Sequence, residues 1–184
     1  LSFLPAGRAL KEKLEQAEPA VGLLKGRPSE AFLPGAYWRS RKPRPVGRAL
    51  NPAEDGCGII WIGPVLPATA QDLERVLDIA EPVFRAHGFD FLLTLSFVTA
   101  RSLSAIMTIT YDREDATDRD KALACHRELA ALTARAGYPA YRGHSQAMDL
   151  SSADQDGFWG VVGRIKAALD PDRIIAPGRY EKSE

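Results

Sequence analysis

The sequence has little of several features that define whole classes of protein. Its 184 residues include only two cysteines, Cys57 and Cys125, and they have no CxxC spacing. This excludes a disulfide framework and a cysteine zinc site, so we expect both to be small buried hydrophobic residues. No apolar run approaches the roughly 20 residues that a membrane-spanning helix needs, and no signal peptide is visible.

Motifs of several enzyme classes are also absent. The chain has no GxSxG, Walker A, GxGxxG or HExxH sequence. Its three histidines, His87, His126 and His144, are scattered without metal-ligand spacing. The 24 basic and 24 acidic residues cancel, so no excess of positive charge indicates nucleic acid or a membrane surface as a partner. The sequence therefore argues against a hydrolase, a metal enzyme and a nucleic-acid-binding protein.

The first part of the chain is predicted to form a helical lead-in and a linker. Residues 1–26 have the spacing of an amphipathic surface helix, which we expect Pro19 to divide into two short helices. Its apolar positions predict one buried stripe: Leu10, Leu14, Ala17, Val21 and Leu24. Residues 26–51 are irregular and carry a basic cluster: Arg39, Arg41, Lys42, Arg44 and Arg48. The cluster could contact an anionic cofactor or an acidic partner, although a solvated loop is the simpler interpretation.

The rest of the chain alternates between strand and helix patterns. The predicted elements are a strand at 58–66, a helix capped by Thr69 and ended by Gly88, strands at 89–99 and 103–111, a helix at 118–136, a strand or extended loop at 138–143, and a helix at 156–169. We expect Pro82 to kink the first of these helices or to remove one of its hydrogen bonds. In the second, His126 is interpreted as an ordinary helix histidine.

This order of elements predicts the fold class. Strand, helix, strand, strand, helix, strand is a split βαβ pattern. The short connection between residues 99 and 103 predicts an antiparallel pair. Apolar and polar residues alternate within 103–111, so one face of that strand is more apolar than the other. We therefore expect an α+β fold, with a ferredoxin-like antiparallel sheet and helices packed on one face.

Two short stretches carry the candidate chemistry. Tyr141 and Arg142 stand between Pro139 and Gly143, and Arg179 follows a Pro-Gly turn. A phenol beside a guanidinium group, with a second guanidinium nearby, can hold an anionic planar molecule. In an extended segment Tyr141 and Arg142 point to opposite faces, so they share a ligand only if the backbone bends. On spacing alone, an edge strand with a buried tyrosine and a solvent-facing arginine is favoured.

Blocks of sequence in a fixed order carry a family resemblance. Near the C-terminus they are AYRGHSQAMD at 140–149 and, after one helix, LDPDRIIAPGR at 169–179. Upstream, GIIWIGP at 58–64 is followed by a helix and by GFDF at 88–91. From about residue 22 onward, the chain thereby resembles the flavoprotein family of vanillyl-alcohol oxidase and p-cresol methylhydroxylase.

The resemblance implies a division of the chain into parts. In that family an FAD-binding domain is joined to a cap domain over the isoalloxazine ring, and the end of the chain returns to the FAD-binding domain. By this comparison, residues 1–51 are the helical lead-in and basic linker, 52–168 the cap, and 169–184 the returning tail. Because the sequence starts at Leu1 rather than Met, we expect a fragment that lacks the FAD-binding half and is inactive by itself.

The resemblance also implies roles for the candidate substrate-binding residues. Tyr141 and Arg142 match the pair that binds the phenolic oxygen of the substrate, where a cation and a hydrogen-bond partner favour the phenolate. His144 matches a histidine found in some members and is a further candidate for substrate contact. We therefore expect an FAD-dependent oxidoreductase that oxidises a para-substituted phenol, either an alkylphenol or a 4-hydroxybenzyl alcohol, by hydride transfer to flavin.

The expected cofactor contact lies near the C-terminus. Arg179, with Pro177 and Gly178 before it, matches the basic residue that meets the pyrimidine edge of the flavin and stabilises its reduced anion. Members that attach FAD covalently do so through a His or Tyr of the cap, but residues 39–86 contain neither. We expect non-covalent FAD, unless Cys57 or the absent half supplies the tether.

Several alternatives and partners stay open. A flavin-dependent 2-hydroxy-acid dehydrogenase would use arginine to grip a carboxylate, and a non-catalytic ferredoxin-like module would need no flavin. Relatives carry a histidine pair where this chain has Ser104 and Ala105, which leaves the exact substrate open. The family uses oxygen or a cytochrome as electron acceptor, and a homodimer through the cap is common in it. We expect a cytoplasmic location, with the periplasm as the alternative, and no membrane or nucleic-acid partner.

Overall fold

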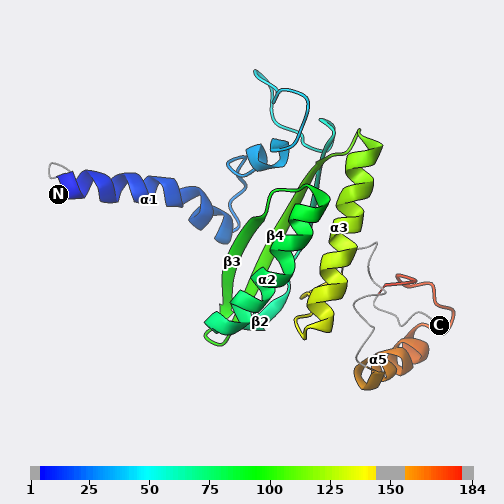
Figure 1. The fold of residues 1–184 in the computed structure, drawn as a ribbon. Coiled ribbons are helices and arrows are strands. Elements are labelled where there is room, and N and C mark those ends of the chain that lie inside the picture. Colours follow the sequence, from blue (N-terminus) through cyan, green and yellow to red (C-terminus); the bar gives the residue numbers. More distant parts are fainter. Residues whose placement is uncertain (1–4, 144–155, 180–184) are drawn as a thin grey trace.

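One long strand, β4 (Ser102–Asp112), organises the sheet. The computed structural model describes residues 5–143 and 156–179, and its strands are all antiparallel to their neighbours. On one side β4 pairs with β1 (Cys57–Ile62) and β2 (Val65–Pro67), and on the other side with β3 (Leu92–Thr99) (Figure 1). The predicted antiparallel pair of strands is therefore confirmed.

The single strand predicted at 58–66 is interrupted, so that part of the prediction is wrong. Ile62 pairs with Met107 and Val65 with Ser104, so the register is the same on both sides of the break. Pro64 lies in the break and has no N–H to donate to a ladder, although its carbonyl still accepts from Ala105 N at 3.0 Å. Strands β1 and β2 are thus one track along β4, broken where proline removes a donor.

The two long helices begin and end close to where the sequence predicted. Helix α2 (Ala70–His87) has Thr69 as N-cap, whose side chain accepts from Asp72 N at 3.1 Å, and it ends at Gly88 with φ 74°. Pro82 lies inside this helix, which continues past it to His87. Helix α3 (Ala116–Arg135) is capped by the Asp115 side chain. These caps satisfy N–H groups at the helix starts, which have no partner within the helix.

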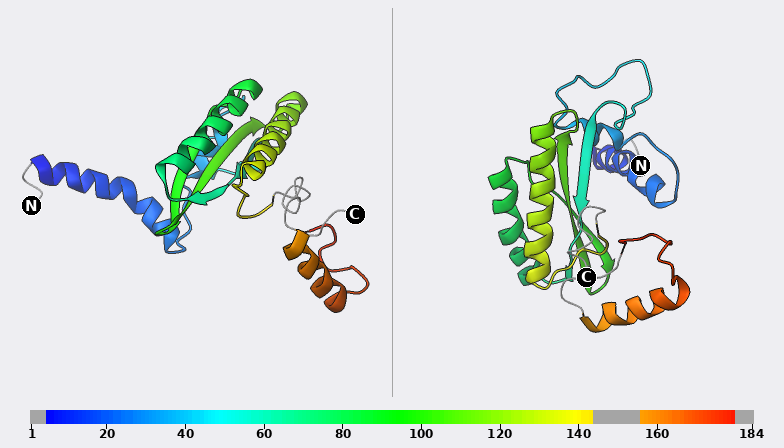
Figure 2. Two further views of the ribbon diagram at one scale, coloured as in Figure 1. Left: turned by 60° about the horizontal axis from the view of Figure 1, so that its bottom comes forward. Right: turned by 90° about the vertical axis from the view of Figure 1, so that its right-hand side faces the viewer.

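The core lies between these helices and one face of the sheet. Figure 2 shows α2 and α3 side by side on that face. Leu103, Ala105, Met107 and Ile109 alternate along β4 and are all buried there, as the alternation predicted. The other buried apolar members come from β1, β2 and the helices: Ile60, Ile62, Leu66, Val76, Ala80, Val83, Phe84, Ala122, Cys125 and Leu129. Cys57 is also buried, so both cysteines behave as predicted.

The segment 138–143 joins the sheet at a single bridge, Pro64 with Ala140. Val65 N donates to Pro139 O and Tyr141 N donates to Gly63 O, each at 3.0 Å. The order across the sheet is therefore the bridge segment, then β1 with β2, then β4, then β3, which is the ferredoxin-like order. The predicted α+β fold, an antiparallel sheet with helices on one face, is confirmed.

The terminal helices differ from expectation in their packing. Helix α1 (Pro5–Leu24) is continuous, so the predicted break at Pro19 is wrong; the proline lies inside the helix. Its expected buried stripe is wrong at Leu14 and Val21, which are 62% and 45% exposed, and the helix projects from the sheet (Figure 1). The side chains of Leu10 and Leu24 lie outside the described part of the chain. Helix α5 (Asp156–Leu169) has the predicted bounds, and its apolar side is exposed: Phe158, Val161, Ile165 and Leu169.

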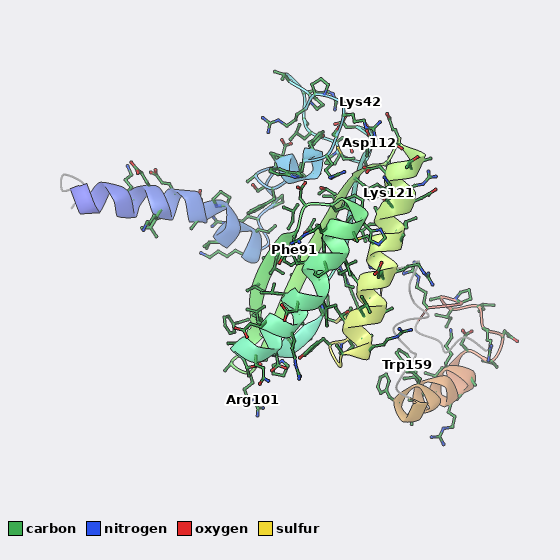
Figure 3. All side chains as sticks on the ribbon, in the orientation of Figure 1. Lys42, Phe91, Arg101, Asp112, Lys121 and Trp159 are labelled. Carbon is green, nitrogen blue, oxygen red and sulfur yellow. The ribbon has the colours of Figure 1, made fainter. Side chains whose placement is uncertain are left out.

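The basic linker is held by ion pairs to acidic residues around the β4–α3 turn. Arg41 lies 2.5 Å from Asp115, Arg39 lies 3.6 Å from Asp118, and Lys42 pairs with Glu114. Figure 3 shows Lys42 in the same region as Asp112, the last residue of β4. Much of the positive charge of the cluster is thus balanced within the chain. The cluster therefore needs no anionic cofactor or acidic partner to balance its charge.

We predict that Tyr138→Phe loosens the start of the 138–143 segment. The buried Tyr138 hydroxyl donates to Asp72 Oδ1 at 2.8 Å, and hydrogen bonds from Thr69 and Tyr138 lower the pKa of Asp72. A lowered carboxylate pKa gives stability that is present above the unfolded value of about 3.9 and is lost as pH falls through the folded value. Thermal unfolding of the intact protein should therefore show a lower Tm near neutral pH.

The difference between Tyr138→Phe and the unchanged protein should shrink below about pH 4. Tyr111→Phe is the matched control, because the Tyr111 hydroxyl makes no hydrogen bond to any residue that the structure describes. Equal Tm values for the two variants at neutral pH would contradict the anchoring role of Tyr138.

Candidate ligand-binding site

A pocket of about 320 Å³ opens on the sheet face opposite α2 and α3. Its lining brings together β1, β4, the bridge segment and the C-terminal segment: Ile59, Ile60, Trp61, Gly63, Ile106, Tyr141, Arg142, Gly143 and Arg179. Tyr141, Arg142 and Arg179 are candidate residues from the sequence, and Arg179 lies far along the chain from the other two. The fold places all three in one pocket.

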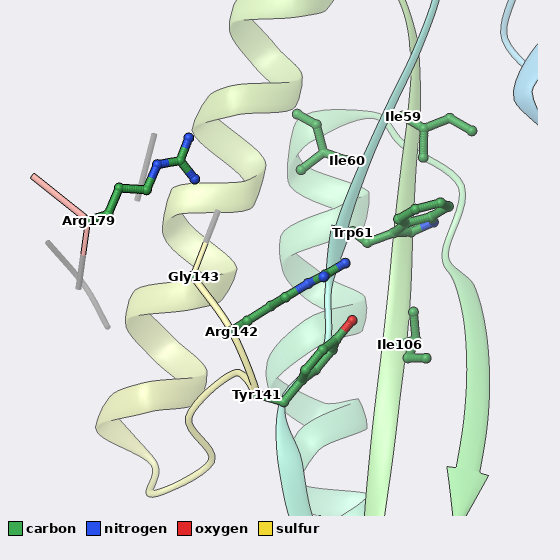
Figure 4. Close-up of a pocket in the computed structure, with 9 residues that line it drawn as sticks. Ile59, Ile60, Trp61, Ile106, Tyr141, Arg142, Gly143 and Arg179 are labelled. Atoms are coloured by element: carbon green, nitrogen blue, oxygen red, sulfur yellow. The ribbon is translucent and has the colours of Figure 1, made fainter. Parts of the chain in front are cut away.

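Tyr141 and Arg142 point into the pocket from one short segment. The chain bends at both residues, and Figure 4 shows the Tyr141 hydroxyl and the Arg142 guanidinium directed toward the side of Trp61. The guanidinium carbon lies 5.4 Å from the centroid of the Tyr141 ring, within cation–π range. Tyr141 is 57% exposed, so the edge strand with a buried tyrosine, favoured by spacing alone, is wrong.

Arg179 reaches the pocket from a tight turn. Arg179 N donates to Ala176 O at 3.1 Å, and Gly178 takes a φ of 72° that favours glycine. Pro177 and Gly178, the other predicted cofactor contacts, shape this turn but do not line the pocket. Arg179 is the member of the trio whose side chain reaches the ligand space.

A buried carboxylate holds the chain just before this turn. The Asp170 side chain accepts from Ile174 N and Ile175 N, both at 3.0 Å, and from Lys166 Nζ at 2.6 Å. Lys166 is the main reason that the pKa of Asp170 is lowered. Helix α5, which carries Lys166, is thereby joined to the segment that leads to Arg179.

Trp61, Gly63 and Ile106 line the pocket but were not among the residues predicted from the sequence. A signal was present in β1, where Trp61 alternates with two isoleucines. Ile60 and Ile62 are each 3% exposed and face the core, whereas Trp61 is 58% exposed on the other face. A large aromatic residue at an outward position of an otherwise buried strand is typical of a binding surface.

Other candidate residues lie away from the pocket or outside the described part. His144 falls in residues 144–155, which lie outside the described residues. Cys57 does not line the pocket, and burial raises the pKa of its thiol, so it is poorly suited to act as a thiolate tether. His126 and Cys125 are buried within α3, and burial raises the pKa of Cys125 to about 12.

The pocket combines an apolar wall with positive charge. Trp61, Ile59 and Ile106 supply the wall, and two guanidinium groups, without any carboxylate among the lining residues, supply the charge. Such a lining suits an aromatic molecule that carries negative charge. Within residues 5–143 and 156–179 there is no group of side chains that could hold a metal ion, and no helix is long and apolar enough to span a membrane.

Sequence comparison identifies relatives of this chain, although no protein-family model matches it. It is 36% identical over 156 residues to 1'-carboxy-chondrochloren decarboxylase from Chondromyces crocatus, covering 85% of this chain and 28% of that protein. It is 30% identical over 129 residues to the 4-cresol dehydrogenase [hydroxylating] flavoprotein subunit of Pseudomonas putida, covering 67% of this chain and 24% of the subunit. The chain thus spans about a quarter of the length of these relatives.

Solved structures with the same fold include phenol-oxidising proteins. The 4-ethylphenol oxidase from Gulosibacter chungangensis, in complex with isoeugenol, matches with a TM-score of 0.61 and 28% identity, covering 68% of this chain and 25% of the oxidase. p-Cresol methylhydroxylase with substrate bound matches with a TM-score of 0.62 and 28% identity, covering 68% of this chain and 24% of that protein.

These relatives define a class, the flavoprotein oxidoreductases. Within that class, the chain belongs to the vanillyl-alcohol oxidase and p-cresol methylhydroxylase family. The family resemblance of the sequence blocks is therefore confirmed.

Proposed function

We propose that this chain is the substrate-side part of an FAD-dependent oxidoreductase that oxidises a para-substituted phenol. The observation that carries the proposal is the pairing of Tyr141 and Arg142, whose polar ends enter one aromatic-walled pocket. Support comes from the relatives, since the names of three of them refer to a cresol or an ethylphenol. A 2-hydroxy-acid substrate fits less well, because Trp61 and Tyr141 supply more aromatic surface than a small acid can use.

The side chains suit the first requirement of phenol oxidation, which is to hold the phenolate. A phenol in water has a pKa near 10. The Arg142 cation and the Tyr141 hydroxyl are placed to share one oxygen, and a fixed cation with a hydrogen bond stabilises the charged form. Negative charge on that oxygen pushes electron density toward the para position, which favours loss of hydride from the substituent carbon bonded there. Trp61 and Ile106 offer apolar surface for the substrate ring.

FAD would supply the hydride acceptor. Arg179 fits a flavin, because it presents a cation to the same pocket from a segment separate from Arg142, and a cation there stabilises a reduced anionic ring. We propose non-covalent binding, since residues 39–86 contain no His or Tyr and Cys57 is buried away from the pocket. Most of the FAD-binding surface would then lie in a domain outside these 184 residues.

We propose the domain division given by the sequence resemblance. Residues 52–168 would be the cap, with 1–51 as lead-in and 169–184 as the returning tail. The arrangement of Arg179 on a segment after α5, reaching back toward β1, supports this division. The electron acceptor, whether oxygen or a cytochrome, and a homodimer through the cap stay predictions. The Pseudomonas relative is called a flavoprotein subunit, which supports a partner subunit as one possibility to test.

A second candidate reaction is oxidation coupled to loss of carbon dioxide. The observation that favours it is the relative at 36% identity, whose name describes the removal of a carboxyl group. Two arginines without a carboxylate among the lining residues leave positive charge for a substrate that carries both a phenol and a carboxylate. Loss of hydride next to the ring would let the carbon–carboxylate bond electrons form a new double bond as carbon dioxide leaves.

We predict that Arg142→Ala lowers phenol turnover by more than the tenfold that about 1.4 kcal/mol represents. The reason is that the phenolate loses its cation while the pocket walls remain. Steady-state kinetics of the intact, FAD-loaded enzyme with 4-ethylphenol would measure the loss, and flavin absorbance should show unchanged FAD content. Arg41→Ala is the control, because the Arg41 side chain pairs with Asp115 and neither residue lines the pocket. Turnover equal to that of the unchanged enzyme would contradict the role of Arg142.

We predict that the flavin is released by acid precipitation. If FAD is non-covalent, the yellow colour should appear in the supernatant and the protein pellet should be colourless. A yellow pellet would show a covalent link.

We predict that Arg179→Ala weakens FAD binding or slows flavin reduction, because the cation near the ring is lost. Unchanged flavin behaviour in Arg179→Ala would count against its contact with the cofactor.

We predict that 3-(4-hydroxyphenyl)propanoate distinguishes the two candidate reactions. Coupled decarboxylation should release one carbon dioxide for each two-electron reduction of the flavin and yield 4-vinylphenol. Oxidation without decarboxylation should reduce the flavin with 4-ethylphenol as well, and should release no carbon dioxide from either compound. Headspace carbon dioxide and product chromatography would measure both outcomes.

A further inference from the structure

Gly63 lies in the break between β1 and β2, directly against the Tyr141 ring. A Cβ atom at Gly63 would lie 2.7 Å from Cε1 and 2.9 Å from Cδ1 of Tyr141, which is well inside the separation of about 3.5–4.0 Å at which carbon atoms attract. The Oγ atom of Ser104 lies 3.4 Å from the same point. A methyl group there would therefore meet atoms from two elements.

The backbone does not explain why this residue is glycine. Six glycines of the described chain take a positive φ, and Gly63 is not among them. Any residue could adopt its backbone conformation, so the constraint comes from its neighbours. Of these, Tyr141 is the one that would be overlapped.

The same two residues are also joined through the main chain. Tyr141 N donates to Gly63 O at 3.0 Å, next to the Pro64–Ala140 bridge. Because the backbone of Tyr141 is fixed to Gly63, the ring can avoid a methyl group mainly by rotating about its own side-chain torsions. Tyr141 is 57% exposed, so that rotation leads toward solvent and carries the hydroxyl away from its place beside Arg142.

We infer that Gly63 is a positioning residue for the phenol-binding site. Because Gly63 has no side chain, the Tyr141 ring can occupy the space next to it and lie beside Arg142. This inference rests on the proposed function. It assigns a role to a residue that makes no polar contact with the phenolic oxygen and acts through Tyr141. The Ser104 hydroxyl bounds this space on the side of β4. It is buried and has no hydrogen-bond partner among the described residues.

Gly63→Ala in the intact, FAD-loaded enzyme tests the inference, with 4-ethylphenol as the probe. We expect KM to rise roughly tenfold or more while FAD content stays unchanged. A tenfold change corresponds to about 1.4 kcal/mol, which is of the order that a hydrogen bond to a charged group contributes. In a Tyr141→Ala background, Gly63→Ala should change KM by less than about twofold, since residues that act through one another are not additive.

Gly58→Ala is a matched control. Gly58 lies in β1 and, like Gly63, has no positive φ. A Cβ atom there would overlap the Tyr111 ring, but Gly58 does not line the pocket. It should lower Tm to a degree similar to Gly63→Ala and leave KM for 4-ethylphenol unchanged. A KM that rises equally in both variants would show a general effect of strand distortion and would overturn the inference.

Other outcomes also decide the matter. An unchanged KM in folded, FAD-loaded Gly63→Ala, or a full additional effect in the Tyr141→Ala background, would overturn it. If Gly63→Ala does not fold, the double variant with Tyr141→Ala should restore folding, because the overlapping ring is gone, and failure to restore it overturns the inference. If Tyr141→Ala alone leaves KM unchanged, the proposed phenol site fails. A crystal structure of Gly63→Ala then judges Gly63 separately, by whether the Tyr141 ring has moved.

Discussion

Two backbone hydrogen bonds at the outer edge of the broken strand hold the candidate site together. They join Val65 to Pro139 and Tyr141 to Gly63, and they fix a segment too short to form a strand of its own beside a long sheet. Because they lie at the break caused by Pro64, the bend at residues 141 and 142 begins where regular pairing stops. Two side chains that an extended strand would separate can therefore enter one pocket.

Local signals in the sequence were sufficient for most of the fold. The Thr69 cap and the Gly88 stop define α2, and the alternation in β4 shows which of its faces is buried. Long-range packing could not be predicted in this way. Helix α1 has an amphipathic pattern, but Leu14, Val21 and Leu23 on it are exposed. Ion pairs between the linker and the β4–α3 turn likewise join residues that are distant in sequence.

The site could be predicted only in part, and for a physical reason. Tyr141, Arg142 and Arg179 are polar or charged residues in loops, where such residues are noticed, and the family resemblance joined them. Trp61 and Gly63 belong to the apolar stretch 58–66, where a tryptophan is interpreted as core and a glycine as a loss of packing. Their role becomes visible only when the bridge segment lies across them.

The outer strand β3 has a consequence for handling the isolated chain. Within the part of the chain that the structure describes, β3 pairs only with β4, and Phe97 and Val98 near its end are 76% and 63% exposed. A free strand edge offers unpaired N–H and C=O groups to other chains, and a formal net charge of zero gives little long-range repulsion. The colloidal stability of these 184 residues in solution thus depends on whether another surface covers this edge.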